Sequence, residues 1–344
     1  MANVLDIRRR IRSVRNTRQI TKAMKMVSAA RLRRAQERAL NARPYARMLT
    51  NVLKSLVERA EIYDPETGVA RHPLLARRPE RNVLLIVVTG DRGLAGAFNA
   101  NIQKAALRFL AERGARTVDL EVIGRKGRDF FRRRFPFNSD PTSRLGPVQV
   151  VGERIGILGG IRYADAAELA AGVIERYSDG ELDAVYLLYN EFKSVISQRL
   201  VVDEVLPIEE IGAADIRMEQ AMTEEERKRV IEAARTAGVG LRAVDTAHID
   251  RKAAAFGAAE VDYIYEQPPA ELFNALLPRY VAVRIYHALI ESVAAEHAAR
   301  MTAMDSATKN AEELIDKLTL QMNRLRQARI TKEIIEIVSG AAAL

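Results

Sequence analysis

The sequence predicts a long α-helical coiled coil that carries a small α/β domain. Its N- and C-terminal helices pair antiparallel, and the α/β domain lies between them in the sequence. Three features predict this fold class: an apolar stripe of helical period near the C-terminus, a second stripe near the N-terminus, and alternating strand and helix patterns between them. Because apolar stripes are buried in stable proteins, pairing the two helices is the simplest way to cover both.

The C-terminal stripe alternates spacings of three and four residues, and no Pro follows Pro278. Such a period is typical of a helix that winds left-handedly around a partner. The stripe comprises Tyr280, Val283, His287, Ile290, Ala294, His297, Met301, Met304, Thr308, Ala311, Ile315, Leu318, Met322 and Leu325. The next apolar residues, Ile330, Ile334 and Ile337, are displaced from its phase. The sequence therefore predicts a shaft helix over residues 261–344 that is paired up to Leu325 and ends in a lone tip.

The N-terminal stripe predicts a second shaft helix over residues 1–60. It begins with Val4, Ile7, Ile11 and Val14. It continues on a shifted phase with Ile20, Met24 and Val27, and after Pro44 with Tyr45, Leu49, Val52 and Leu56. No Gly occurs before Gly68, which agrees with a long helix.

The charge of this helix is strongly uneven. The chain of 344 residues has a net charge of +9, and residues 8–38 hold twelve Lys or Arg but a single acid, Glu37. Four interpretations fit such a stretch: an organelle transit peptide, a DNA-binding arm, a membrane-surface helix, and a face that is solvated or contacts acidic protein. Poor heptads after the basic stretch argue against a basic zipper, and the long helix that follows argues against a transit peptide.

Residues 61–81 contain three Pro and one Gly and predict a linker. Residues 82–211 then alternate between strand and helix patterns, which predicts a Rossmann-like α/β base domain with a mainly parallel sheet. Strands are expected at residues 83–88, 118–123, 148–151, 184–189 and 195–202, and helices at 99–113 and 163–177. The first strand is apolar throughout, so we expect it to be buried on both faces. Residues 212–260 break the pattern and are interpreted as an insertion at the base.

No site for bond chemistry emerges from the residues. The chain has no Cys, which excludes disulfides, thiolate metal sites and thiol catalysis, and its four His are scattered. A Gly-rich turn at residues 89–97 follows the first strand, but its spacing is GxxGxxG, which matches neither the dinucleotide turn nor the phosphate loop. We therefore expect no catalytic residue, no cofactor and no metal, and interpret these glycines as a tight turn against the sheet.

Four segments resemble the gamma subunit of the F-type ATP synthase of bacteria. They are residues 11–29 (IRSVRNTRQITKAMKMVSA), 89–99 (TGDRGLAGAFN), 296–304 (EHAARMTAM) and 326–341 (RQARITKEIIEIVSGA). They cover both ends and the middle of the chain in the order found in that family. Motifs of this length are highly specific.

The resemblance implies a central rotor stalk. In that family the terminal helices stand as a shaft inside a ring of three alpha and three beta subunits, and the α/β domain lies against the epsilon subunit and the c-ring. Ion flow through the c-ring turns the shaft, which drives the catalytic beta subunits through their conformational cycle. The gamma subunit is a non-catalytic part of this rotary, proton-translocating complex. The expected location is peripheral, on the cytoplasmic side of the bacterial plasma membrane, with membrane contact only through the c-ring and no nucleic-acid partner.

The resemblance also assigns contact residues. The beta-subunit contact falls on Arg326, Gln327 and Thr331 of the C-terminal helix and on Met24 of the N-terminal helix, with Lys22 and Lys25 beside it. The bearing tip, which turns in an apolar sleeve, contains Ile334, Ile337 and Val338.

Two alternatives belong to other classes of protein. A coiled-coil nucleic-acid-binding protein would use the basic N-terminal helix and bind DNA with steep salt dependence. A nucleotide-binding enzyme would use the Gly-rich turn. The missing phosphate-binding motifs argue against the second alternative.

Overall fold

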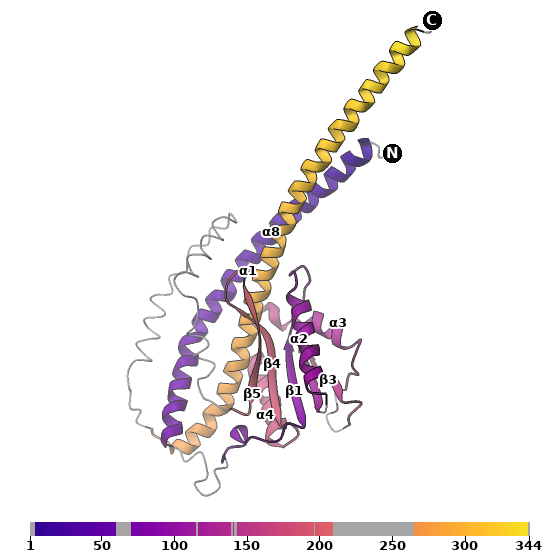
Figure 1. Cartoon of the computed structure of the whole chain (residues 1–344). Coiled ribbons are helices and arrows are strands. Elements are labelled where there is room, and N and C mark those ends of the chain that lie inside the picture. The colour runs from indigo at the N-terminus through magenta and orange to yellow at the C-terminus, as the bar shows by residue number, and fades with distance from the viewer. Residues whose placement is uncertain are drawn as a thin grey trace.

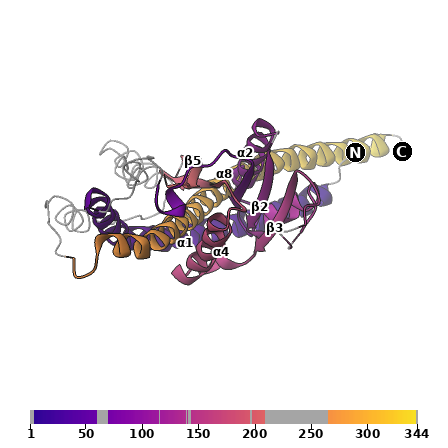
Figure 2. The same cartoon turned by 90° about the horizontal axis from the view of Figure 1, so that it is seen from below.

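A computed structural model describes residues 4–59, 70–114, 116–138, 140, 143–195, 197–208 and 265–342. Two long helices dominate it: α1 (Val4–Arg59) and α8 (Pro269–Ala342). They run antiparallel, so both termini lie at one end of the molecule, and the C-terminus extends farther (Figures 1 and 2). The α/β domain lies beside the other end of this helix pair, as Figure 1 shows. The predicted fold class is therefore confirmed.

The α/β domain contains one five-stranded sheet in the order β3-β2-β1-β4-β5. The strands are β1 (Asn82–Val88), β2 (Thr117–Ile123), β3 (Val148–Arg154), β4 (Ala184–Phe192) and β5 (Gln198–Leu206). All neighbouring pairs are parallel except β4 and β5, which are antiparallel. The predicted mainly parallel sheet is therefore correct.

Helices cover both faces of this sheet. They are α2 (Phe98–Glu112), α3 (Arg125–Phe131) and α4 (Tyr163–Ser178), with short 3-10 turns at Pro73–Leu75 and Ile157–Gly159. One face of β1, which includes Leu84 and Ile86, packs in the same core as α4, α8 and α1. The other face, which includes Val83 and Leu85, packs against α2. The first strand is thus buried on both faces, as its continuous apolar run predicts, and the shaft shares a core with the domain.

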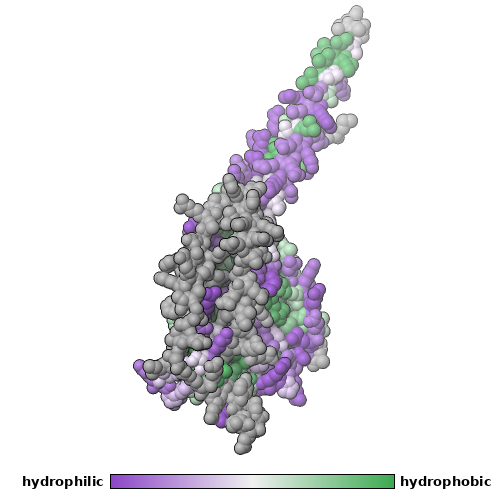
Figure 3. All heavy atoms as spheres, turned by 60° about the vertical axis from the view of Figure 1, so that its left-hand side comes forward, coloured by the Kyte–Doolittle hydropathy of each residue, from purple (hydrophilic) through white to green (hydrophobic). Residues whose placement is uncertain are grey.

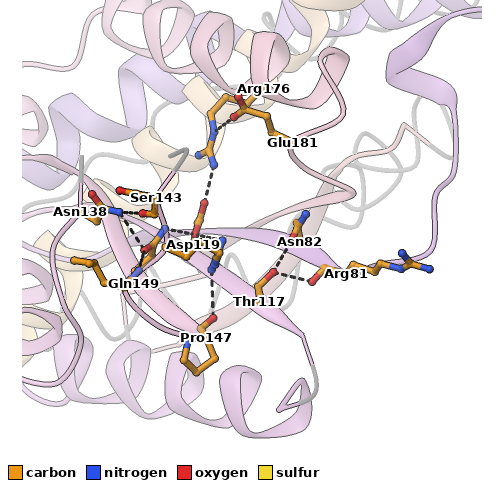
Figure 4. Close-up of polar contacts among 12 residues, drawn as sticks. Arg81, Asn82, Thr117, Asp119, Asn138, Ser143, Pro147, Gln149, Arg176 and Glu181 are labelled. Atoms are coloured by element: carbon orange, nitrogen blue, oxygen red, sulfur yellow. Dashed lines mark hydrogen bonds and ion pairs between the residues drawn. The ribbon is translucent and has the colours of Figure 1, made fainter. Parts of the chain in front are cut away.

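The buried carboxylate of Asp119 links β2 to the edge strand β3 and to α4 (Figure 4). Asp119 of β2 accepts hydrogen bonds from Arg176 Nη2 of α4 at 2.6 Å and from Gln149 Nε2 of β3 at 3.2 Å. Arg144, which precedes β3, forms an ion pair with the same carboxylate at 3.0 Å. A buried charge is tolerated when it is paired and hydrogen-bonded in this way. Asp119 therefore ties β3 and α4 to β2.

The boundaries of the shaft helices follow local sequence. The last helix begins at Pro269 rather than at residue 261, because Pro268 disfavours helical backbone before it and Pro269 suits the first helical position. The predicted insertion at residues 212–260 lies outside the described residues. The proposed division of the chain into shaft, linker, base and insertion stays a prediction.

The predicted middle part of the α1 stripe is wrong. Ile20 and Val27 are 60% and 53% exposed, and Met24 is half-buried. The α1 residues that face α8 here are Thr21 and Ser28, which are both buried. Ile20 and Val27 lie on the outer side of α1, because polar side chains on its inner side pair with residues of α8, as described below.

Elsewhere the α1 stripe is largely correct. Ile7 and Ile11 near its start, and Leu49 and Leu56 near its end, are buried. Tyr45 is an exception, because it is 50% exposed and the neighbouring Ala46 is buried in its place.

Candidate interaction surface of the helical shaft

The shaft helix α8 is tied to the sheet by polar contacts along its lower half. Arg284 Nη2 donates to the Asp203 carboxylate and to the Glu204 carbonyl of β5, each at 2.8 Å. Higher on α8, Glu291 accepts a hydrogen bond of 3.0 Å from the backbone N–H of Phe192, at the end of β4. Together with the shared apolar core, these contacts attach the helix to two strands.

A third contact joins α8 to the Gly-rich turn after β1. Arg300 forms a buried ion pair with Glu296, and both side chains are 8% exposed. The same guanidinium donates to the carbonyls of Gly93, at 3.3 Å, and Arg92, at 3.4 Å. A Cβ atom added at Gly90 would lie 2.7 Å from Glu296 Oε1, so a side chain there would displace the Glu296 carboxylate. We call Glu296, Arg300 and this turn the clamp.

The protonation equilibria of the clamp reflect its burial. Burial raises the pKa of Glu296, while the positive charge and hydrogen bond of Arg300 act in the opposite direction. Burial lowers the pKa of the neighbouring His297 to about 4, with smaller contributions from Arg300 and Arg31. His297 is therefore neutral near pH 7.

The clamp explains the glycines that the sequence places after β1. In many α/β domains a nucleotide binds at the carboxyl end of the first strand. Here α8 approaches that turn, and the Glu296 carboxylate lies against it. The negative charge of the Glu296 carboxylate at this position would repel an anionic phosphate. The turn is therefore in contact with the protein's own shaft helix.

Above the clamp, α1 carries an exposed basic face. Arg8, Arg12, Arg15 and Lys22 are exposed, and Figure 3 shows hydrophilic residues gathered on this part of the shaft. Lys22 forms no ion pair within the described ranges. The predicted contact residue Met24 is half-buried beside it.

Lys25 has a different environment from Lys22. Its Nζ lies 2.6 Å from Asp305 Oδ1 of α8, and its side chain is only 14% exposed. Burial alone would raise the pKa of Asp305, but the hydrogen bonds and positive charges of Lys25 and Lys309 together hold the pKa below its usual value. Lys25 thus belongs to the contact between the two helices.

The predicted contact residues on α8 lie where its pairing with α1 ends. The last paired residues are Met322 and Leu325, which pack on the apolar cluster around Ile11. Arg326 and Gln327 follow and are exposed. In the part of α8 that the structure describes, Arg326 has no ion-pair partner, whereas Arg329 pairs with Glu333 at 2.9 Å.

Thr331 lies one turn beyond Gln327 and is exposed, although its hydroxyl donates to the Gln327 carbonyl at 3.0 Å. The structure thus brings Arg326, Gln327 and Thr331 together on bare helix. It places them away from Lys25, which faces inward.

The tip of α8 is apolar and bare. Ile334, Ile337 and Val338 are 56%, 71% and 61% exposed, and Figure 3 shows hydrophobic residues near the end of the shaft. A monomeric protein rarely leaves so many large apolar side chains together in water. Exposed apolar patches of this kind are typical of interaction sites.

The clamp residues were not predicted as functional. Glu296 and Arg300 stand four residues apart on a stretch of α8 that is rich in buried Ala. Opposite charges at this spacing within a buried stretch are the signal that could have identified them.

Within the described residues, no group of three or more His, Asp or Glu side chains is arranged to hold a metal ion. Across those same ranges, no helix is both long and apolar enough to cross a membrane.

Comparison with known proteins places the chain in a family. The family model described as ATP synthase matches residues 3–344. The ATP synthase gamma chain of Solibacter usitatus is 51% identical over 343 residues, which cover 100% of this chain and 99% of that one. The gamma chain of Anaeromyxobacter sp. strain Fw109-5 is 46% identical over 347 residues, with 100% of both chains covered. Because these alignments span the whole chain, residues 212–260 are shared with these relatives.

Two solved structures share the fold. One is the central stalk and c-ring of the Tetrahymena thermophila mitochondrial ATP synthase, with a TM-score of 0.53, 24% identity, and coverage of 84% of this chain and 99% of that one. The other is from the Euglena gracilis mitochondrial ATP synthase, with a TM-score of 0.56, 18% identity, and coverage of 99% and 94%. A full-length family match and close bacterial relatives thus agree with the paired shaft and its bare tip, and the chain belongs to the ATP synthase gamma chain family.

Proposed function

We propose that this chain is the central rotor stalk of an F-type ATP synthase. Its shaft stands within the ring of alpha and beta subunits, and its base contacts the epsilon subunit and the c-ring. Rotation of the c-ring, driven by ion flow, turns the chain and drives the beta subunits through their conformational cycle. The chain performs no bond chemistry itself.

The observation that carries this proposal is the length difference between the two shaft helices. The 74 residues of α8 span about 110 Å, whereas the 56 residues of α1 span about 84 Å. The excess of α8 leaves Arg326 and everything beyond it without α1 beside it. A bare single helix with an apolar end suits insertion into a surrounding sleeve.

Charge on the shaft suits contacts that form and break. Lys22 and Arg326 are exposed basic residues for which the described part of the chain offers no ion-pair partner. Exposed ion pairs contribute about 1 kcal/mol or less each, so an acidic loop of a beta subunit can engage and leave them at each step. An extensive apolar contact at this level would resist release.

The attachment of the base supports the transmission of torque. A force applied to the α/β domain reaches α8 through Arg284, Glu291 and the clamp, which are spaced along the helix. Buried polar contacts of this kind have defined geometry and resist sliding.

The proposed location is peripheral. We place the chain on the cytoplasmic side of the bacterial plasma membrane, where it reaches the membrane through the c-ring. The bacterial origin of the relatives at 51% and 46% identity supports this assignment.

Affinity purification of the tagged full-length chain from its native membrane extract tests the proposal. We expect alpha, beta and epsilon subunits and the c-ring to co-purify, and truncation of the first half of α1 to abolish that co-purification. Recovery without alpha and beta subunits would contradict the proposal. Recovery with DNA that dissociates steeply with salt would instead favour the nucleic-acid alternative.

The double variant Arg326→Ala/Gln327→Ala should weaken the coupling between ATP hydrolysis and rotation. Removal of an exposed charge and an amide costs about 1 kcal/mol at this contact, so torque and ATP synthesis should fall while nucleotide binding by the beta subunits is unchanged. Single-molecule torque and ATP synthesis in membrane vesicles measure the effect. Arg33→Ala/Glu37→Ala, which removes an exposed pair lower on the shaft, serves as the control. Unchanged torque and unchanged synthesis in the first variant would remove Arg326 and Gln327 from the contact.

A further inference from the structure

The core between the two shaft helices is divided into two apolar blocks. The lower block extends along α1 from Ala29 and along α8 to Met301. The upper block consists of Ile7, Ile11, Ile315 and Leu318, with smaller contributions from their neighbours. The stretch between the blocks, which we call the neck, contains Arg18, Thr21, Lys25 and Ser28 of α1 and Asp305, Thr308 and Glu312 of α8. It also contains Met304 and Ala311 of α8, which are buried but belong to neither block.

Side chains in the neck pair across the two helices. Lys25 Nζ lies 2.6 Å from Asp305 Oδ1, and these side chains are only 14% and 23% exposed. The hydroxyl oxygens of Thr21 and Thr308 lie 2.8 Å apart. Each hydroxyl also has a carbonyl of its own helix as an acceptor, Arg18 for Thr21 at 3.0 Å and Met304 for Thr308 at 2.7 Å, so one hydroxyl donates across the helices in place of its own-helix bond.

A second ion pair in the neck is looser. Arg18 and Glu312 are 3.5 Å apart and 40% and 53% exposed. The neck therefore contains the tight, largely buried ion pair Lys25–Asp305, the hydroxyl pair Thr21–Thr308 and the exposed ion pair Arg18–Glu312. The exposed ion pair serves as a control for the buried one.

Apolar packing alone specifies the register of these helices weakly. Several members of the lower block are small: Ala29, Ala35, Ala39 and Ala46 of α1 and Ala294 and Ala298 of α8. Residues of similar size that recur at a regular spacing pack almost equally well after a shift along the helix. A polar pair differs, because any shift leaves a half-buried charge without its partner.

We propose that Lys25 and Asp305 form a register lock for the shaft, supported by Thr21 and Thr308. The pair fixes how far α1 and α8 are displaced along one another in the stretch between the two apolar blocks. Lys25 and Asp305 are positioning residues in this role. The lock concerns the chain's own helices and does not depend on the proposed function.

One consequence does rest on the proposed function. Lys22 and Met24 belong to α1, whereas Arg326 and Gln327 belong to α8. The register therefore sets the relative heights of the proposed beta-subunit contacts on the two helices. A shift by one helical turn would displace one set by about 5 Å relative to the other.

Disulfide formation in the purified full-length chain tests the lock. The chain has no Cys, so Thr21→Cys/Thr308→Cys creates a single reporter of the native register. Lys309 also contacts Asp305, at 3.1 Å, so Lys309→Ala is included in every variant to leave Lys25 as the only partner. The rate of disulfide formation under limiting oxidant is measured for each variant.

We expect Lys25→Asp to lower this rate by roughly tenfold, within the range of coupling between contacting residues. The charge swap Lys25→Asp/Asp305→Lys should restore it to within about twofold. Glu312→Lys, which reverses one charge of the exposed Arg18–Glu312 pair, should change the rate of disulfide formation by less than about twofold. Equal rates for the parent and Lys25→Asp would overturn the lock, as would a charge swap that fails to restore the rate.

A separate variant distinguishes register from stability. Lys25→Met/Asp305→Leu replaces the ion pair with apolar side chains, which typically preserves or raises stability. We expect its melting temperature to be maintained and its disulfide rate to fall at least about threefold, since apolar side chains do not select one register. A maintained rate in this variant would show that apolar packing sets the register and would refute the proposal.

Discussion

Arg300→Met should lower the free energy of unfolding by about 3–5 kcal/mol at neutral pH, because it leaves the buried Glu296 carboxylate without its partner. Met keeps most of the volume of the Arg side chain, so the loss reports mainly on charge and hydrogen bonding. The variant also loses the donors to the Gly93 and Arg92 carbonyls. Urea unfolding of the full-length chain measures the effect.

The loss should depend on pH in a defined direction. Burial already raises the pKa of Glu296, and removal of Arg300 raises it further. A carboxyl group whose pKa is higher in the folded state binds more protons when folded, so stability falls as pH rises from the unfolded pKa toward the folded one. Arg300→Met should therefore regain stability as pH is lowered from 7 toward the unfolded pKa of Glu296.

The control is Glu296→Gln/Arg300→Met, which removes both charges. His297, Asp91 and Arg31 also influence the clamp, but all three are present in both variants and their contributions largely cancel. We expect the double variant to be more stable than Arg300→Met at pH 7 and to lack the recovery at low pH. Equal stabilities of the two variants at pH 7 would show that Glu296 is not held as a buried charge by Arg300.

Gly124→Ala should be comparably damaging, for a steric reason. Gly124 follows β2 with φ of +94°, a conformation that L side chains rarely adopt, and an added Cβ would lie 2.1 Å from the backbone oxygen of Thr89. Because that oxygen belongs to the turn that the clamp holds, the chain there has little room to move. Backbone strain and overpacking together should cost roughly 4 kcal/mol in unfolding free energy.

Gly172→Ala supplies a control of opposite sign. Gly172 lies inside α4, is exposed, and an added Cβ meets no atom within 4 Å. In a helix interior, Ala is favoured over Gly by about 1 kcal/mol, so this variant should be slightly more stable than the parent. The contrast is measured by chemical denaturation of both variants. A Gly124→Ala chain as stable as the Gly172→Ala chain would show that the close contact with Thr89 is absent.

The fold was predictable where one residue pattern dominates. The apolar run of β1 indicates a strand that is buried on both faces. The regular stripe of α8 indicates a helix whose pairing with α1 ends at Leu325. In both patterns the apolar positions are the ones that are buried, so the sequence predicts the structure correctly.

The middle of α1 was not predictable from hydrophobicity. Ile20 and Val27 suggest an apolar stripe, yet Thr21 and Lys25 face α8 because Thr308 and Asp305 supply their partners. Those partners lie about 280 residues away along the chain, where a local pattern carries no information about them.

The candidate contact surface was predictable in part. The residues from Arg326 to Ser339 are exposed on α8. This exposure agrees with the contact role that the family resemblance predicts for Arg326, Gln327, Thr331 and the tip. The inward position of Lys25 and the clamp at Glu296 and Arg300 depend on tertiary contacts. Whether the exposed residues touch beta subunits stays a prediction.

The central claim is that this chain rotates, and direct observation of rotation tests it most directly. Glu112 is exposed on α2 of the base, and the chain has no other thiol, so Glu112→Cys allows a visible probe to be attached there. With the ring of alpha and beta subunits fixed to a surface, we predict that ATP drives continuous rotation of the probe in one direction. A probe that stays stationary while the same complex hydrolyses ATP at its full rate would contradict the account.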